Sequence, residues 1–407
     1  MAHRSGLHVS QRTRTVLIAI TVALAVVTVV AMVLLRPTGA DRPDLSGLGF
    51  VSETVDAEVV SAPDVPCEGQ PEGGVTCREV TFEVVEGDRS GQLVTQDFVL
   101  TGTTPRLEAG DRVVLAHDPG AEPGFEYRFV DRDRQSTLVW LAVLFAVAVV
   151  ALGRLRGLTA LGGLVVSIGV LIVFVLPAIL DGRSPLAVAI VGSAAIAFLA
   201  LYLAHGFTTM TTVALLGTLG ALALTAGLAE VFVGLSQLSG FASEEAIVVQ
   251  IGAANVDLRG IILGGVVIGA LGAIDDMTVT QASAIWELRS ASPQMSRSDL
   301  LRSGLRIGRD HVASTVNTLA LAYAGASMPV MLLLVLSRQS LGTVANGEVI
   351  ATEIVRTLVG SIGLVAAVPL TTWLAAVAAS GSQRKGANES ADMRRPVKGC
   401  QGGARSG

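Results

Sequence analysis

Long apolar runs separated by short polar segments occupy most of this chain, and they predict helices that cross a membrane. The runs lie at Val16–Leu35, Leu138–Gly153, Leu158–Leu180, Leu186–Ala204, Thr212–Leu235, Ile261–Trp286, Val312–Leu336 and Val355–Val377. Most of them reach the roughly 17–25 residues that a spanning helix needs, and Leu138–Gly153 is at the lower limit. We therefore predict a polytopic α-helical membrane protein with about eight transmembrane helices.

The polar region between the first two runs, residues 41–135, predicts a small β domain. Its short alternating segments lie at Ser52–Val60, Glu79–Val85, Leu93–Leu100, Arg112–His117 and Tyr127–Val130. Turn signals rich in glycine, aspartate and proline separate them, which is typical of consecutive strands. About five short strands fit a small closed, OB-like barrel, because closure removes the edges that such strands would otherwise expose.

Cys67 and Cys77 fall within the predicted β domain, and Cys400 lies near the end of the chain. If the β domain lies outside the cytoplasm, the oxidising compartment favours a Cys67–Cys77 disulfide; two free thiols are the alternative. The three cysteines and five histidines form no cluster with the spacing of metal ligands. We therefore expect no metal and no cofactor.

The positions of the arginines and lysines predict which segments face the cytoplasm. Arginines precede the first apolar run, whose length of about twenty residues exceeds the ~7–15 residues of a signal-peptide core, so we predict an uncleaved signal anchor. With the N-terminus inside, the segments on the cytoplasmic side carry most of the later basic residues, namely Arg154, Arg156, Arg289, Arg297, Arg302, Arg306, Arg309, Arg384, Lys385, Arg394, Arg395 and Lys398. The positive-inside rule then places both termini in the cytoplasm and the β domain outside.

The predicted organisation has four parts. Residues 1–40 form a cytoplasmic N-terminus and the signal anchor, residues 41–135 the extracytoplasmic β domain, residues 136–380 a seven-helix membrane domain, and residues 381–407 a basic, disordered cytoplasmic tail. A content of 51% hydrophobic and 15% charged residues, with a mean hydropathy of +0.61, agrees with a membrane protein. Few lysines beside many Ala, Gly, Val and Arg residues indicate a GC-rich bacterial genome, so we expect the plasma membrane, with the lipid bilayer as a partner and no nucleic acid.

Two adjacent carboxylates, Asp275 and Asp276, stand inside the run Ile261–Trp286. A charged side chain within the hydrocarbon layer costs about 2.5–3.5 kcal/mol on insertion scales, so such residues usually face protein or water and mark a functional site. At helical spacing, one stripe holds Gly265, Gly269, Gly272, Asp276, Thr280 and Ser283, and the other faces hold Val266, Ile268, Leu271 and Ile274. We expect the glycine stripe to pack against a neighbouring helix, because glycines let two backbones approach closely.

Successive helix positions diverge by about 100°, so the two carboxylates cannot both point along the stripe. Asn317 of the following run is the expected partner of Asp276, either in a functional site or in an ordinary interhelical hydrogen bond. The pair itself is either a cation or proton site or a structural polar contact. Glu230 is expected near the outer membrane face, away from Asp276, and His311 at a solvated helix end.

Two segments resemble the YibE/F-like family of bacterial multi-pass membrane proteins. They are DLRGIILGGVVIGALGAIDDM, which begins at Asp257, and TVNTLALAYAGASMP, which begins at Thr315. The resemblance covers roughly residues 138–377 and implies a polytopic plasma-membrane protein with no established activity. Its motif residues correspond to Gly272, Asp275 or Asp276, Asn317, Tyr323 and Gly325.

These observations favour a transporter or permease for a cation, a proton-coupled solute or a small polar solute. Its candidate functional residues are Asp275, Asp276, Thr278, Thr280 and Asn317, and its candidate helix-packing residues are Gly265, Gly269, Gly272 and Gly325. The alternative is a non-transporting envelope scaffold or sensor, whose β domain binds an envelope protein or a second copy of the chain. An enzyme is not expected: an intramembrane aspartyl protease needs aspartates on two helices, and no Walker A, GxSxG or HExxH motif is present.

Overall fold

The computed structural model describes residues 9–39, 53–67, 76–86, 89–122, 124–242, 244–253 and 255–380. The chain divides into two compact units, and we call residues 43–152 the β unit and residues 1–42 with 153–407 the membrane unit. The predicted basic tail, residues 381–407, lies outside the described residues. Each unit has its own hydrophobic core.

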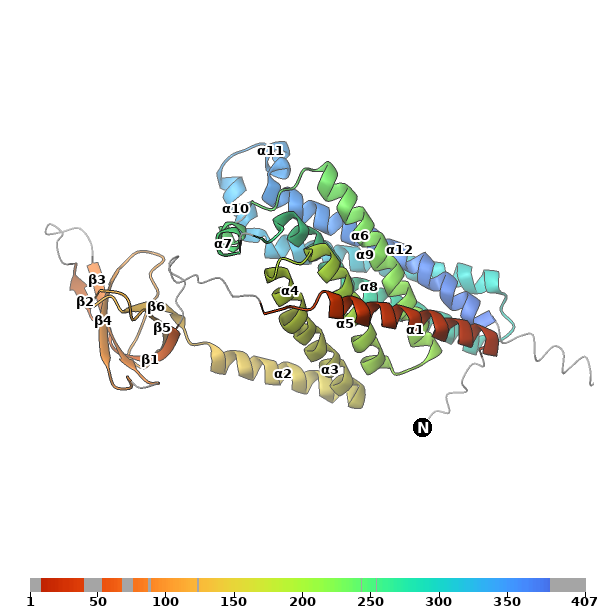
Figure 1. Cartoon of the computed structure of the whole chain (residues 1–407), viewed down its shortest axis with the longest axis horizontal. Helices are drawn as coiled ribbons and strands as arrows, with labels where there is room; N and C mark the ends of the chain where they lie inside the picture. The colour runs from red at the N-terminus through yellow and green to blue at the C-terminus, as the bar shows by residue number, and fades with distance from the viewer. Residues whose placement is uncertain are drawn as a thin grey trace, which may run out of the picture. The chain divides into compact units, whose positions relative to one another are not determined.

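The β unit is a small curled sheet, a half-barrel (Figure 1). Its strands are β1 Glu53–Ser61, β2 Asp64–Pro66, β3 Thr76–Val84, β4 Leu93–Val99, β5 Arg112–His117 and β6 Tyr127–Arg132, followed by helix α2 Gln135–Gly153. All pairings are antiparallel, in the order β2-β3-β1-β5-β6, and β4 pairs with β3. The prediction of five strands missed β2, because three residues are too few to show alternation.

A single side chain links the two edges that the curl of the sheet brings together. The amide Nε2 of Gln96 on β4 donates to the carbonyl oxygen of Tyr127 at 2.5 Å, and its Oε1 accepts from the N–H of Phe129 on β6 at 3.1 Å. No strand pairing joins β4 to β6 within the described residues. The sheet is therefore a half-barrel that Gln96 bridges, in place of the predicted closed barrel.

Alternate strand residues form the core of the β unit, as the period of two requires. Val80 and Phe82 on β3 and Leu115 on β5 are fully buried. The Phe82 ring lies 6.4 Å from that of Phe98 and 6.3 Å from that of Phe129, which joins β3, β4 and β6. This aromatic cluster stabilises the curl of the sheet, because offset and edge-to-face ring pairs add to the burial of their area.

Cys67 and Cys77 form a disulfide in the β unit, with a Cα–Cα distance of 4.9 Å. Cys67 directly follows β2, and Cys77 belongs to β3 and is buried. The bond covalently joins the chain at the end of β2 to β3, the strand with which β2 pairs.

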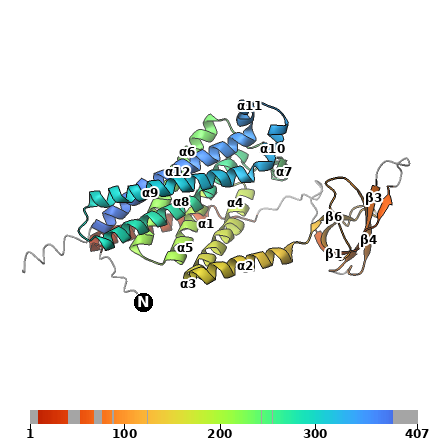
Figure 2. The ribbon, with the colours of Figure 1, turned by 180° about the vertical axis from the view of Figure 1, so that it is seen from behind.

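The membrane unit is a helical bundle (Figures 1 and 2). Its helices are α1 Gln11–Leu34, α3 Leu155–Val170 continued by a π-helical turn Leu171–Val175 and α4 Leu176–Leu180, α5 Pro185–His205, α6 Thr209–Leu235, α7 Glu244–Gly252, α8 Leu258–Ala291, α9 Arg297–Ala326, α10 Met328–Leu336, α11 Leu341–Asn346 and α12 Glu348–Ser380. With α2, seven helices in the described part of the chain are long and apolar enough to cross a membrane.

The predicted span Val312–Leu336 is not one continuous helix. The structure forms it from α9 and α10, which are bent by 63° relative to each other. Pro329 is the second residue of α10. It has no N–H to donate to the carbonyl four residues earlier, and its ring crowds that carbonyl, so α9 ends just before it.

The core of the membrane unit lies where α6, α8 and α12 pack together, and α5 packs against α8 from another side (Figure 1). On α8 the buried face recurs every three or four residues, at Val266, Ala270, Ile274, Met277, Gln281 and Ile285. The predicted glycine stripe of α8 packs closely only in part: Gly265 and Gly269 approach side chains of α12 and α9, whereas a Cβ on Gly272 would meet no atom within 4 Å and Asp276 is exposed. The sequence could not show which side of α8 is buried, because lipid tails are as apolar as a protein core and both sides carry apolar residues.

Two glycine contacts bring α6 and α12 close together. A Cβ atom on Gly217 of α6 would collide with the Thr371 side chain of α12, and one on Gly363 of α12 would collide with Thr225 of α6. Both threonines are fully buried. Each helix thus contributes one glycine, and a threonine side chain of the opposite helix packs against that glycine.

We predict that Gly217→Leu destabilises the membrane unit, because no side chain fits between α6 and Thr371. Overpacking of a well-packed core costs about 1–3 kcal/mol, so the melting temperature of the detergent-purified protein should fall clearly. Gly227→Leu is the matched control, since Gly227 is an exposed residue of the same helix whose Cβ would meet nothing within 4 Å. Equal melting temperatures of the two variants, measured by fluorescence-detected size exclusion after heating, would contradict this packing.

A turn in the β unit generates a pH prediction. The Asp111 carboxylate accepts from the backbone N–H of Glu108 at 3.0 Å and lies 3.1 Å from the Arg132 guanidinium. These two partners, the N–H first, hold the pKa of Asp111 below its ordinary value. The contribution of Asp111 to stability is therefore complete above the unfolded-state pKa of about 3.9 and is lost as pH falls through the lower folded-state pKa.

We predict that Asp111→Asn lowers the melting temperature of a fragment spanning residues 43–134 by about 4–8 °C at pH 7, which corresponds to about 1 kcal/mol. The difference from the wild type should shrink as pH falls below the unfolded-state pKa of about 3.9 and vanish once the wild-type carboxylate has taken up its proton at its lower folded-state pKa. Asp56→Asn is the control, since Asp56 is exposed on β1 and its carboxylate makes no hydrogen bond or ion pair among the described residues. A pH-independent difference would show that Asp111 acts through its shape rather than its charge.

Candidate functional site

The two adjacent aspartates of α8 contact different helices, as their angular separation of about 100° requires. Asp275 is half-buried and faces α6, whereas the Asp276 side chain is 69% exposed and faces α9. The pair therefore divides into an inner carboxylate within the bundle and an outer carboxylate at its surface.

The inner carboxylate belongs to a chain of hydroxyl groups. Thr218 of α6 donates through Oγ1 to Asp275 Oδ1 at 3.2 Å, and the hydroxyls of Thr218 and Thr278 are 2.7 Å apart. Thr278 also lies 3.0 Å from the backbone carbonyl of Asp275. Because each hydroxyl has one proton, Thr218 can donate to the carboxylate and keep its hydrogen bond with Thr278 only while Thr278 donates to Thr218 rather than to that carbonyl.

A third threonine, Thr371 of α12, lies next to this chain of hydroxyls. Its side chain and the Thr278 methyl group would both contact a Cβ added to Gly217. Thr371 is fully buried, and its Oγ1 has no hydrogen-bond partner among the described residues. An unsatisfied buried hydroxyl costs about 1–3 kcal/mol, so Thr371 retains free hydrogen-bonding capacity within the core. We call Asp275, Thr218, Thr278 and Thr371 the inner polar cluster.

A second polar contact lies farther along the same face of α8. Gln281 is 1% exposed, and its Nε2 donates to the Gly304 carbonyl of α9 and to Thr372 Oγ1 of α12, both at 2.7 Å. Thr372 in turn donates to the Val368 carbonyl at 2.6 Å. The Gln281 amide thus joins α8, α9 and α12 through hydrogen bonds, which makes it a positioning residue for the bundle.

The outer carboxylate faces a histidine rather than the predicted asparagine. Asp276 Oδ2 lies 4.0 Å from His311 Nε2 of α9. Asn317 is exposed, and no hydrogen bond joins it to Asp276 in the described part of the chain. Thr280 donates to the backbone carbonyl of Asp276 at 2.7 Å, within its own helix. Of the predicted partners, the structure thus brings Thr278 to Asp275 and leaves Asn317 apart.

The other end of the glycine stripe meets a positive charge. A Cβ on Gly265 would lie 3.3 Å from the Arg356 guanidinium of α12, and one on Gly269 would collide with the Tyr323 hydroxyl of α9. Arg356 lies over the Tyr323 ring, 5.9 Å from its centroid, and pairs with Glu353 at 2.6 Å. At 1.5 Å per residue, Gly265 and Asp276 are about 16 Å apart along α8. The stripe therefore runs from a cation to a carboxylate.

Two glycines that we predicted to pack helices together, Gly272 and Gly325, do not do so: a Cβ on either would meet no atom within 4 Å. Glu230 lies away from both aspartates and pairs with Arg259 near the start of α8 at 2.7 Å, with both side chains about half exposed. It is thus part of a separate surface ion pair.

The sequence contained signals for residues that the prediction missed. Thr211, Thr218 and Thr225 recur every seven residues in α6, and all three are buried. Such a spacing keeps residues on one face of a helix, so it marks the side of α6 that meets α8 and α12. His311 and Arg356 carried no comparable signal, because their roles depend on how α9 and α12 pack.

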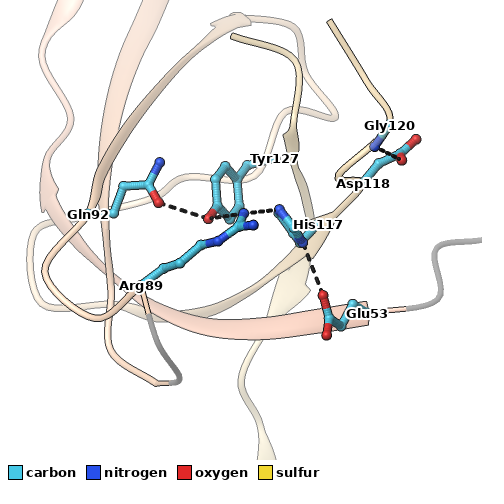
Figure 3. A network of polar contacts seen from close by, with 7 residues as sticks. All are labelled: Glu53, Arg89, Gln92, His117, Asp118, Gly120 and Tyr127. Carbon is cyan, nitrogen blue, oxygen red and sulfur yellow. Dashed lines mark hydrogen bonds and ion pairs between the residues drawn. The ribbon is translucent and has the colours of Figure 1, made fainter. Parts of the chain in front are cut away.

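The β unit contains its own polar network, in which His117 and Tyr127 are buried and the other members are exposed (Figure 3). His117 is 3% exposed; its Nδ1 lies 3.1 Å from Glu53 Oε2, and its Nε2 contacts the Arg89 guanidinium. Arg89 Nη1 also lies 3.3 Å from the Tyr127 hydroxyl, which donates to Gln92 Oε1 at 3.0 Å. Arginine can only donate, so His117 Nε2 accepts its hydrogen bond. His117 Nδ1 then carries the proton and donates to the Glu53 carboxylate. The network links β1, β5 and β6 and thereby stabilises this edge of the half-barrel.

Comparison with known proteins covers most of the membrane unit. No curated protein and no solved structure matches the chain. The family model described as YibE/F-like protein matches residues 141–381, which include both aspartates, the inner polar cluster and His311. The match extends over more than half of the chain and confirms the resemblance found in the sequence. The chain belongs to the YibE/F-like family.

Proposed function

We propose that this protein is a membrane transporter or permease in which the inner polar cluster binds a proton or a monovalent cation. The observation that carries the proposal is the contact between Asp275 and hydroxyl groups inside the bundle, where α6, α8 and α12 meet. An ionisable residue at membrane depth is costly and is usually kept for a substrate, ion or proton pathway.

The chemistry of the cluster favours a small charge of +1. Its oxygens are one carboxylate and three hydroxyls, which are hard ligands of the kind that alkali and alkaline-earth cations prefer. One carboxylate balances one positive charge, and no group of three or more His, Cys, Asp or Glu in the described residues could hold a metal ion. A proton or Na⁺ would neutralise Asp275 and give the free Thr371 hydroxyl a role.

The outer carboxylate supports a route to the cluster. Asp276 and His311 lie on the exposed side of α8, next to Asp275 in the sequence but on the face towards α9. Transport also needs elements that can change shape, and the described part of the bundle has three places where a helix is irregular. These are the bend between α9 and α10, the π-helical turn Leu171–Val175 and Pro369 within α12. Broken and irregular helices commonly line transport sites.

The cellular setting is part of the proposal. We place the protein in a bacterial plasma membrane with eight spans, the α9–α10 pair forming one broken span, and with both termini in the cytoplasm. The arginines at the end of α8 and in the first half of α9 support this orientation through the positive-inside rule. The β unit, an OB-like half-barrel, then lies outside, and the Cys67–Cys77 disulfide supports an oxidising compartment.

A second function has support from the β unit. It is a compact unit with its own core and disulfide, so it suits the binding of an envelope protein. In that case the protein is a scaffold or sensor, and its helices anchor the β unit or transmit its state.

We predict that Asp275→Asn abolishes cation-dependent activity of the full-length protein in proteoliposomes, since the amide cannot balance a charge of +1. Uptake of ²²Na⁺ and proton release, followed with an internal pH dye, are the two measurements. Thr371→Val should lower the apparent affinity for the cation about tenfold, which corresponds to the ~1.4 kcal/mol of one lost ligand contact. Glu287→Gln is the matched control, because Glu287 is an exposed carboxylate of the same helix.

The same variants separate the two functions in cells that lack the gene. A transporter should fail to restore ion balance when both Asp275 and Asp276 are replaced by Asn, although the protein accumulates in the membrane. A scaffold should tolerate the double replacement and fail when residues 53–132 are deleted. If the double variant behaves as the wild type in proteoliposomes and in cells, the transport proposal is wrong.

We predict that the protein isolated from membranes has one free thiol. The sequence has three cysteines, and the disulfide leaves Cys400 as the remaining one. Alkylation in denaturant should add one label without reductant and three with it, as measured by mass spectrometry of the intact chain. Cys67→Ser should raise the unreduced count to two. Three labels before reduction would argue against an extracytoplasmic β unit.

A further inference from the structure

A large cavity in the membrane unit lies apart from the inner polar cluster, between α1, α3, α5 and α6. Its volume is about 920 Å³. Most of its lining is apolar and includes Ile18, Val22, Ala25, Val166, Phe198 and Leu199. A cavity of this size with an apolar lining can accept a long apolar group in contact with its walls.

One end of this cavity is positively polarised. Arg14, near the start of α1, lines it, and its side chain is exposed and has no ion pair within the described residues. The first turn of α6 lines the same end through Thr208, Thr209 and Thr212. Thr208 caps α6 by accepting from the Thr211 N–H at 3.1 Å. The helix N-terminus and the guanidinium together favour an anion.

A free hydroxyl lies deeper in the cavity. Thr21 lines it and is 8% exposed, and its Oγ1 has no hydrogen-bond partner in the part of the chain that the structure describes. The other buried threonine of α1 behaves differently, since Thr28 donates to the Leu24 carbonyl at 2.8 Å. Thr21 is seven residues from Arg14, which is about 10 Å along the helix. The cavity thus presents a cation, then a free hydroxyl, then an apolar surface.

We propose that this cavity binds one anionic phospholipid. The phosphate lies at Arg14 and the first turn of α6, a glycerol ester oxygen accepts from the Thr21 hydroxyl, and an acyl chain follows the apolar lining. A free anion would leave the apolar length and Thr21 unused. A zwitterionic lipid would gain less from Arg14, because it has no net charge. Basic pockets between transmembrane helices are suited to lipid headgroups in this way.

The test is native mass spectrometry of the full-length protein in detergent, titrated with dioleoyl phosphatidylglycerol or dioleoyl phosphatidylcholine. We expect one phosphatidylglycerol per chain, bound at least fivefold more tightly than phosphatidylcholine. Arg14→Gln should weaken phosphatidylglycerol about fivefold, the equivalent of ~1 kcal/mol for one basic residue, and Arg14→Lys should restore it. Arg12→Gln is the matched control, because Arg12 lies on the same turn of α1 but does not line the cavity.

Two further variants test the deeper parts of the cavity without changing its charge. Ala25→Phe should displace the acyl chain, and Thr21→Val should lower affinity while the preference for phosphatidylglycerol over phosphatidylcholine stays. Glycerol phosphate, which has the headgroup charge and no chain, should not compete. Equal affinity of Arg14→Gln and Arg12→Gln, equal binding of the two lipids, or displacement by glycerol phosphate would each overturn the proposal.

Discussion

The close approach of α6, α8 and α12 is the constraint on which the membrane unit depends. Within a bilayer, helices gain little from leaving apolar surroundings, so association must come from packing and interhelical hydrogen bonds. Gly217 and Gly363 allow the packing, since each receives a threonine from the opposite helix. The same approach brings Thr218 to Asp275 and Thr371 beside Thr278. The geometry that holds the bundle together therefore also creates its polar interior.

A buried arginine joins the C-terminal end of α8 to its neighbours. Arg289, near the end of α8, is 2% exposed, and its guanidinium donates to the carbonyls of Ala379, Pro293 and Met295 at 3.1, 3.0 and 2.7 Å. Ala379 lies at the C-terminal end of α12, where helix carbonyls carry partial negative charge, and Pro293 and Met295 belong to the loop between α8 and α9. Three carbonyls thus satisfy this cation without a carboxylate. Together with Gln281, Arg289 fixes α8 to α12 and to the start of α9. The half of α9 beyond this region is mostly exposed, and the α9–α10 bend lies there.

Sequence reasoning located the helices and the family, because length, apolarity and motif residues can be read directly. It failed where the answer depends on which neighbour a face meets. The glycine stripe of α8 looked like a packing surface, yet Val266 and Ile274 are the buried residues, since apolarity alone cannot separate a lipid-facing side from a protein-facing one. The partner of Asp276 was misassigned for a related reason: His311 and Asn317 both belong to α9, and the rotation of α9 about its own axis decides which of them meets α8. The β2 strand was missed because its three residues owe their conformation to β3 and to the neighbouring disulfide.

The adjacency of Asp275 and Asp276 has a consequence for the proposed transport. One backbone position separates a carboxylate in the core from a carboxylate on the surface, so their charges repel each other at short range through a medium that screens poorly. A cation at Asp275 removes that repulsion and leaves Asp276 free to attract His311, which is now 4.0 Å away. Under the proposed transport, release of the cation restores the repulsion between the two carboxylates. Two neighbouring aspartates would thus let the occupancy of the inner polar cluster change the electrostatic potential at the surface carboxylate that meets α9, which a single aspartate could not do.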